Sequence, residues 1–241
     1  MINIGFLANT SIELMGKTNY LKNLIFAIDS LKLKSIQIHI FIGKKTNIET
    51  KIFFKNYANV VENSMFDRKS LRWYLNKIES KIIGTNLILE NFLNKHKIQI
   101  ISHSSIISLR KIKMINWIPD FQHIHIPYMF SDSEIKKRNK YFKKAIKNSD
   151  VILLSSYDAL KDFKNFDRKN SFKAKVLQFV SQPHEVYYKL NNDDKKIILD
   201  KYNLKNDYFY IPNQYWKHKN HILVFKVINE LKNEGVNINL I

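Results

Sequence analysis

The chain has no cysteine, and its 241 residues include only five glycines and four prolines. The absence of cysteine excludes a disulfide scaffold and any metal or nucleophile chemistry based on cysteine. No uncharged apolar run approaches the roughly 18 residues that are needed to span a bilayer. The N-terminal sequence MINIGFLANTS has neither a basic leader nor a small-residue cleavage site, so it does not read as a secretory signal. We therefore expect a cytoplasmic protein.

Acidic residues are scarce, with 21 against 40 basic residues, and the formal net charge is +19. This balance indicates an anionic partner, such as nucleic acid, an anionic lipid surface or a phosphorylated substrate. Few of the basic residues are arginine, whereas nucleic-acid recognition usually uses arginine forks. The sequence also contains no recognised nucleic-acid module. We expect no nucleic-acid partner and favour an anionic membrane surface or a phospholipid-linked substrate; a basic nucleic-acid-binding protein and a non-catalytic membrane-surface protein are the alternatives.

Short apolar runs alternate along the chain with longer amphipathic segments. The expected strands are Asn3–Ala8, Ile36–Ile42, Ile98–Ser102, Met114–Ile118, Val151–Ser155, Lys175–Val180, Tyr208–Ile211 and Val236–Ile241. The expected helices are Lys17–Leu31, a region Lys69–Lys95 that is broken near Gly84, Ser133–Asn148, Tyr157–Phe163 and His221–Glu234. Ile- and Val-rich strands that alternate with helices predict an α/β protein with a Rossmann-like, doubly wound parallel sheet.

Composition changes after Gln182, where polar residues replace the apolar runs. We expect a first domain over residues 1–182, an interdomain linker over 183–205 and the start of a second domain over 206–241. A single βαβ unit cannot cover both faces of a sheet, and the sequence stops at Ile241 inside an apolar run. These features lead us to expect a truncated second domain and a chain that is poorly stable or self-associating.

The segment Tyr210–His221, YIPNQYWKHKNH, lies between a predicted strand and a predicted helix. A strand that turns through basic residues into a helix N-terminus forms an anion site, because free N–H groups and the helix dipole both favour negative charge there. Asn220 is the expected N-cap and Lys219 lies beside it. An ordinary βα loop with a solvated basic surface explains the same pattern.

This segment closely resembles the start of the C-terminal domain of family 4 glycosyltransferases, which have the GT-B fold. The resemblance implies transfer of a sugar from a nucleotide-sugar donor to a glycan or lipid-linked acceptor, with retention of configuration and without a metal or other cofactor. It implies that Lys219 contacts the donor phosphate, and that Asn213 and Gln214 bind donor where many relatives have an arginine. The family's Glu-x7-Glu pair is missing from this sequence, so we expect weak or no activity of the chain as given.

The first βα turn, Asn9 to Thr18, contains one glycine, Gly16. Members of the family have a glycine-rich loop here that approaches the donor diphosphate, so the resemblance implies that Gly16 binds donor. A single glycine is not a dinucleotide fingerprint. A turn glycine with positive φ explains it equally well.

The segment Trp117–Pro127, WIPDFQHIHIP, follows a predicted strand. Ligands bind at the carboxyl ends of parallel strands, so Asp120 and His123 are candidate catalytic residues that could orient a sugar hydroxyl. The string WIPDFQH also resembles the same glycosyltransferases, which implies that Gln122 contacts the acceptor in the cleft. More distant relatives have His-Asp at this turn, whereas Pro119 takes the His position here.

Two other interpretations of this segment stay open. Asp120, His123 and His125 are metal-ligand types, but no further carboxylate is nearby in sequence and we expect no metal. The segment could also be a structural loop whose aromatic and proline residues pack under the sheet edge.

A basic helix, Ser133–Asn148, leads into the strand before Ser155 and Ser156. Such a basic run is usually a solvated surface. In members of the family the equivalent strand ends in a serine that faces the cleft, which implies that Ser155 or Ser156 contacts the acceptor.

The segment Arg68–Ile83 is amphipathic, with apolar residues at helical spacing among basic ones. Trp73 could take an interfacial position, so the helix could hold the protein peripherally on the inner face of the cell membrane. A helix that packs its apolar side against the sheet gives the same pattern.

Overall fold

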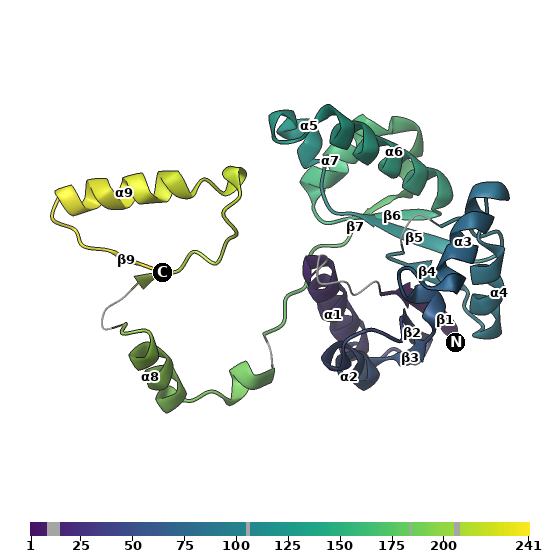
Figure 1. The fold of residues 1–241 in the computed structure, drawn as a ribbon, viewed down its shortest axis with the longest axis horizontal. Coiled ribbons are helices and arrows are strands. Elements are labelled where there is room, and N and C mark those ends of the chain that lie inside the picture. Colours follow the sequence, from purple (N-terminus) through teal and green to yellow (C-terminus); the bar gives the residue numbers. More distant parts are fainter. Residues whose placement is uncertain (9–14, 105–106, 184, 205–207) are drawn as a thin grey trace. The chain divides into compact units, whose positions relative to one another are not determined.

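The computed structural model describes residues 1–8, 15–104, 107–183, 185–204 and 208–241 (Figure 1). Among them no helix is both long and apolar enough to cross a bilayer. The chain divides into two compact units, Met1–Gln182 and Pro183–Ile241. Each unit is described by itself.

The first unit is built on a seven-stranded sheet with the strand order β3-β2-β1-β4-β5-β6-β7. Every neighbouring pair in this sheet is parallel, which confirms the predicted doubly wound α/β fold. The strands are β1 Ile2–Leu7, β2 Ile36–Ile42, β3 Asn59–Glu62, β4 Ile100–Ser102, β5 Lys113–Ile118, β6 Val151–Leu154 and β7 Ala174–Val176.

Both faces of the sheet are covered, because alternate residues of each strand point to opposite sides. On one face Phe6 and Ile40 pack against α1 (Met15–Ser30) and α2 (Ile48–Tyr57). On the other face Phe41 and Met114 pack against α4 (Leu87–Lys95). Further along this second face, Ile118, Ile152 and Leu154 pack against α6 (Asp132–Asn148) and α7 (Tyr157–Phe166).

Among the α-helices and strands of the first unit, β3, α2 and the short α5 (Gln122–His125) were not predicted. In β3 only Val60 and Val61 are apolar, and none of its four residues is fully buried. The strand lies at the sheet edge, so it lacks the long apolar run by which a central strand is recognised. Helix α2 has the weakest amphipathic pattern of the helices that pack on the first face, and only Thr50 and Phe54 are buried in it.

The predicted helical region Lys69–Lys95 is divided as expected, into α3 (Leu71–Ile82) and α4. Gly84 lies between them with φ of 77°, a left-handed conformation that glycine adopts without steric cost.

The second unit contains η5 Glu185–Lys189, α8 Asn192–Lys201, β8 Tyr208–Phe209, η6 Lys217–Lys219, α9 His221–Asn233 and β9 Asn239–Leu240. Strands β8 and β9 form a parallel pair, in the register Tyr208 to Asn239 and Phe209 to Leu240. They are shorter than the predicted strands, although the Ile211 N–H still donates to the Ile241 carbonyl at 2.9 Å beyond them.

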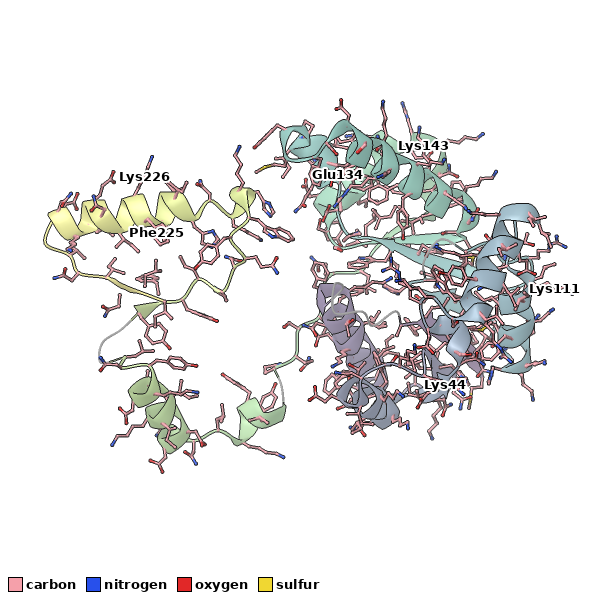
Figure 2. The ribbon with its side chains drawn as sticks, in the orientation of Figure 1. Lys44, Lys111, Glu134, Lys143, Phe225 and Lys226 are labelled. Carbon is pink, nitrogen blue, oxygen red and sulfur yellow. The ribbon has the colours of Figure 1, made fainter. Side chains whose placement is uncertain are left out.

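Apolar side chains of the second unit stay accessible to water. Phe225 and Lys226 lie on different sides of α9 (Figure 2), yet even Phe225 is 54% exposed. Among the described residues of this unit no side chain is buried. The apolar residues of β8 and α9 therefore do not form a closed core within the unit.

Gly43, directly after β2, is packed against the carboxylate of Asp67. A β-carbon built at Gly43 would meet Asp67 Oδ1 well inside van der Waals contact. The Asp67 carboxylate accepts the backbone N–H groups of Lys44, at 3.1 Å, and Lys45, at 3.0 Å. The turn that follows β2 therefore depends on a residue without a side chain at position 43.

We predict that Gly43→Ala lowers the free energy of unfolding by about 1–3 kcal/mol, the usual cost of overpacking. Gly16→Ala is the control, because a β-carbon there meets no heavy atom within 4 Å and alanine is favoured over glycine within a helix. Urea unfolding of both variants measures the difference. A Gly43→Ala variant as stable as the parent would contradict this packing.

Candidate functional site

A cavity of about 290 Å³ opens at the carboxyl ends of β4 and β5. It is lined by Lys17, His103, Ser104, Trp117, Pro119, Arg138, Tyr141 and Phe142. The chain passes from β1 to β2 on one side, whereas β4 pairs with β1 on the other. Lys17 follows β1 and His103 follows β4, so the cavity borders the topological switch point between these two strands, where open parallel sheets bind their ligands. A larger cavity, of about 350 Å³, lies around the start of β2, away from this edge.

Stacked aromatic rings support one wall of the cavity. The rings of Tyr20 and Trp117 are 4.2 Å apart and nearly parallel. The Trp117 indole donates a hydrogen bond of 3.0 Å to Ser155 Oγ, which fixes the ring on the sheet. Burial raises the pKa of Tyr20 to about 12, so its phenol stays neutral. The wall thus presents an apolar surface with a rigid support.

His103 lies at the base of the cavity and was not predicted as a site residue. Its ring nitrogens form hydrogen bonds with Ser102 Oγ at 2.8 Å and Tyr20 Oη at 2.9 Å. Burial, together with the positive charge of Lys17, lowers its pKa to about 3. A neutral imidazole is therefore held in one orientation. His103 follows a predicted strand directly, so the rule that selected Asp120 would also have found it.

The backbone of His103 is in the left-handed region, with φ of 54°. This conformation is uncommon for a residue with a β-carbon. Here the two ring hydrogen bonds and the stack against Phe6, with centroids 5.8 Å apart, hold the residue in place. Strained residues of this kind concentrate at functional sites.

Two cations line the same cavity. Lys17 is in the first turn of α1, and burial lowers its pKa. Arg138 comes from α6 and lies 4.8 Å from the centre of the Phe130 ring. Its Nη1 is 3.9 Å from Asp120 Oδ1, a long contact between partly exposed groups. The cavity is thus positively charged near the start of a helix, where a bound anion is favoured.

Three of the predicted residues lie beside this cavity. Gly16 precedes Lys17 in α1 and has open space on its Cα. Asp120 follows Pro119 of the lining, and its Oδ1 accepts the backbone N–H of Gln122 at 3.1 Å. Ser155 lies behind the wall, with its hydroxyl engaged by Trp117.

The other predicted residues of the first unit lie elsewhere. His123 is 1% exposed; its Nε2 lies 2.9 Å from Asn139 Oδ1, and its ring packs edge-on against Phe142. Gln122 is exposed at the start of α5 (Gln122–His125). Ser156 is the N-cap of α7 and accepts the N–H of Ala159. None of these three lines the cavity, so their roles toward substrate stay predictions.

His125 is paired with Asp162, at 2.8 Å, rather than with Asp120. This hydrogen bond and the nearby negative charge raise the pKa of His125. In the part of the chain that the structure describes, no three His, Asp or Glu side chains gather as a metal site would require.

In the second unit, Asn213, Gln214 and Lys219 lie on the connection from β8 to α9. All three are exposed, and Lys219 ends the η6 turn. Asn220 occupies the N-cap position of α9 with φ of 51°, but its side chain accepts no capping hydrogen bond. Asn220 is therefore the N-cap residue, as predicted, but it acts through its left-handed backbone and not through a side-chain hydrogen bond.

No family model and no curated protein matches the sequence significantly. Solved structures do. A glycosyltransferase from Rickettsia africae matches with a TM-score of 0.54 and 12% identity, over 96% of this chain and 58% of that one. HepE from Anabaena, in complex with UDP and glucose, matches with a TM-score of 0.53 and 12% identity, over 95% and 58%. The HepE complex with UDP-glucose gives 0.51 and 10%, over 100% and 69%.

The chain has the fold of these glycosyltransferases. At such low identity the likeness concerns the fold alone. The chain spans less than two thirds of the length of the first two structures.

The buried His103 predicts a pH dependence of stability. Its pKa is lowered to about 3 in the folded chain, against about 6.5 when unfolded. Below pH 6.5 His103 is therefore protonated in the unfolded chain but stays neutral in the folded chain. The free energy of unfolding falls as the pH is lowered. The slope is about 1.4 kcal/mol per pH unit, so about 2 kcal/mol is lost between pH 7.5 and pH 5.

We predict that His103→Asn removes this loss, because asparagine tolerates the left-handed backbone and does not titrate. Urea unfolding at both pH values, for the parent and the variant, isolates the contribution of His103. His125→Asn is the control with opposite sign, since the raised pKa of His125 adds stability at low pH that disappears as the pH rises. Equal losses in the parent and in His103→Asn would refute the buried neutral imidazole.

Proposed function

We propose that the chain transfers a sugar from a nucleotide-sugar donor to a glycan or lipid-linked acceptor, with retention of configuration, as family 4 glycosyltransferases do. The observation that carries the proposal is the cationic cavity at the topological switch point, in a fold shared with glycosyltransferases, one of which is solved with UDP and glucose. A pyrophosphate requires positive charge and free N–H groups, and the cavity offers both beside α1.

Gly16 and Lys17 are proposed to bind the donor diphosphate at the start of α1. The open space at Gly16 lets a phosphate approach the backbone N–H groups, which have no partner within the helix in its first turn. Lys219, Asn213 and Gln214, on the connection from β8 to α9, are also proposed as donor-binding residues. The uncapped start of α9 leaves its first N–H groups to an anion in the same way.

Asp120 is proposed as the catalytic carboxylate toward the acceptor hydroxyl, held near the cavity by Arg138. The apolar wall formed by Trp117 and Phe142 fits the C–H face of a sugar ring. Ser155 acts by fixing the Trp117 indole. His123 is buried against Phe142 and bonded to Asn139, both of which belong to α6. These contacts favour a role of His123 in positioning α6 over direct contact with the sugar.

Gln122 and Ser156 are proposed to contact the acceptor only at its outer end, because neither lines the cavity. No metal or other cofactor enters the proposal: the charge that a diphosphate leaving group develops is stabilised by the cationic side chains and the helix N–H groups.

Calorimetric titration of the chain with UDP and UDP-glucose tests the donor assignment directly. Saturable binding that requires the diphosphate, absent with glucose alone, is expected. If the chain binds neither UDP nor UDP-glucose, and neither GDP nor GDP-mannose, the donor assignment is wrong.

We predict that Lys17→Met weakens diphosphate binding by about 1–3 kcal/mol, as expected for a lost charge-assisted hydrogen bond. Lys22→Met is the matched control: it removes the same charge from the same helix, but Lys22 lies over the Phe53 ring and not at the cavity. The same titration measures both variants. Equal losses from the two would show that only the net charge of α1 matters.

We further predict that Lys219→Ala weakens donor binding by about 1–3 kcal/mol, whereas Asp120→Ala and His123→Ala lower turnover and leave donor affinity nearly unchanged. Lys219 is the basic residue beside the start of α9, while Asp120 lies on the acceptor side of the proposed site. Titration with nucleotide, beside a sugar-transfer assay, separates the two effects. Loss of donor binding in Asp120→Ala but not in Lys219→Ala would reverse the assignment of the two loops.

A further inference from the structure

Helix α3 presents its apolar side to solvent. Leu71, Leu75, Ile78 and Ile82 recur at the spacing of one helix face, and their exposed fractions are 76%, 48%, 52% and 79%. Tyr74, beside them, is 47% exposed. We call these five residues the α3 stripe. An amphipathic helix of a soluble domain normally buries such a stripe against the core, whereas no residue of α3 is buried.

The opposite, polar side of α3 attaches it to the first unit. Asn76 Oδ1 accepts a hydrogen bond of 3.1 Å from the Asn86 side chain. The Glu79 carboxylate accepts the backbone N–H of Ile88 at 3.0 Å and 3.1 Å, at the start of α4. Ser70 caps the helix, accepting the N–H of Trp73. The helix is thus fixed by polar contacts that hold the stripe outward.

The exposed charged side chains beside the stripe are basic. Arg72, Lys77 and Lys81 are the basic residues of α3, and all are exposed. Lys77 lies 4.0 Å from the centre of the Trp73 ring. Glu79 is the single acidic residue of the helix, and its carboxylate is occupied by α4. An exposed apolar stripe is therefore flanked by cations on long, flexible side chains.

We infer that α3 is a docking helix for an anionic lipid surface. Lysine and arginine stems can lie along the apolar face while their charged ends reach anionic head groups, and tyrosine suits the boundary between water and acyl chains. The inference extends the open membrane interpretation of this segment. It does not rest on the proposed sugar transfer.

The alternatives to a bilayer fit these features less well. A second copy of the chain would place α3 lysines against α3 lysines in a two-fold contact, and like charges repel. The stripe is also small for a protein partner: a twelve-residue helix is about 18 Å long and 10 Å wide, far below the roughly 800 Å² that each partner buries in a standard interface. A bilayer accepts a single exposed helix that lies flat on it.

A second basic region lies over the same face of the sheet. Helix α6 carries a row of lysines around a shallow groove, Lys136, Lys140, Lys143, Lys144 and Lys147. Figure 2 shows Lys143 extending away from the body of the first unit. Both α4, which supports α3, and α6 pack on the side of β5 that carries Met114 and Ile118. This row adds long-range attraction toward an anionic surface.

Sedimentation of the full chain with lipid vesicles tests the inference. The chain is expected to bind vesicles that contain phosphatidylglycerol, and to bind phosphatidylcholine vesicles weakly or not at all. The double variant Ile78→Glu/Ile82→Glu should lose about tenfold or more in affinity, because both apolar contacts are lost and negative charge is added. Lys77→Gln/Lys81→Gln should weaken binding to the anionic vesicles only.

The matched control is Ile48→Glu/Ile52→Glu on α2. These isoleucines have the same spacing and are 65% and 54% exposed, but α2 covers the opposite face of the sheet. The control changes charge by the same amount, so it should bind vesicles within about twofold of the parent if binding uses α3.

Three results would overturn the inference. Equal vesicle binding by the α3 variant and the α2 control would show that the stripe is not used. A large loss of unfolding free energy in Ile78→Glu/Ile82→Glu would show that the stripe is covered within the chain. Absence of vesicle binding, with a dimer in size-exclusion chromatography that the α3 variant dissociates, would assign the stripe to contact between copies.

Discussion

The pairing of β1 with both β2 and β4 is the constraint on which the rest of the first unit depends. The chain goes from β1 to β2 and β3 on one side, and then crosses to β4 on the other side of β1. A close approach at Gly5 makes this possible: a β-carbon there would lie 2.6 Å from Ile101 Cδ1 and 2.9 Å from Phe41 Cε2. Because Gly5 lacks that atom, Ile101 and Phe41 pack closely over β1 on the face that α4 covers. At the carboxyl edge of the sheet, the residues that directly follow β4 and the first turn of α1 line the cavity together.

Burial at the base of this cavity has an electrostatic consequence. Desolvation disfavours the charged form of a histidine and of a lysine alike, and the positive charge of Lys17 lowers the pKa of His103 further. His103 stays neutral and is hydrogen-bonded to Tyr20 and Ser102, so Lys17 carries the positive charge of the pair. An anion that binds there would restore favourable surroundings to a lysine that burial destabilises, which is a physical reason for this cavity to select negatively charged ligands.

The sequence predicts the sheet well because its central strands are continuous apolar runs and its helices have one apolar side. It also predicts the edge of the sheet at which polar residues gather, since those residues directly follow the strands. It could not show which of them reach the cavity. Asp120 and His123 are three residues apart, yet the short α5 turn sends His123 into the core beside Phe142 while Asp120 stays partly exposed. That outcome depends on tertiary packing and not on spacing.

The orientation of helix α3 also could not be predicted from the sequence. Periodicity measures how completely apolar and polar residues segregate, but it carries no information on which side faces the protein. Asn76 and Glu79 of α3 accept hydrogen bonds from the Asn86 side chain and the Ile88 backbone N–H. These contacts fix which side of α3 faces the protein. Asn86 is buried, and an unpaired buried polar group is costly, so its bond to Asn76 holds the polar side of α3 against the protein. Helix α3 begins beyond the carboxyl end of β3, at the edge of the sheet that carries the cavity. A bilayer that held α3 would therefore lie near the edge of the sheet that carries the cavity.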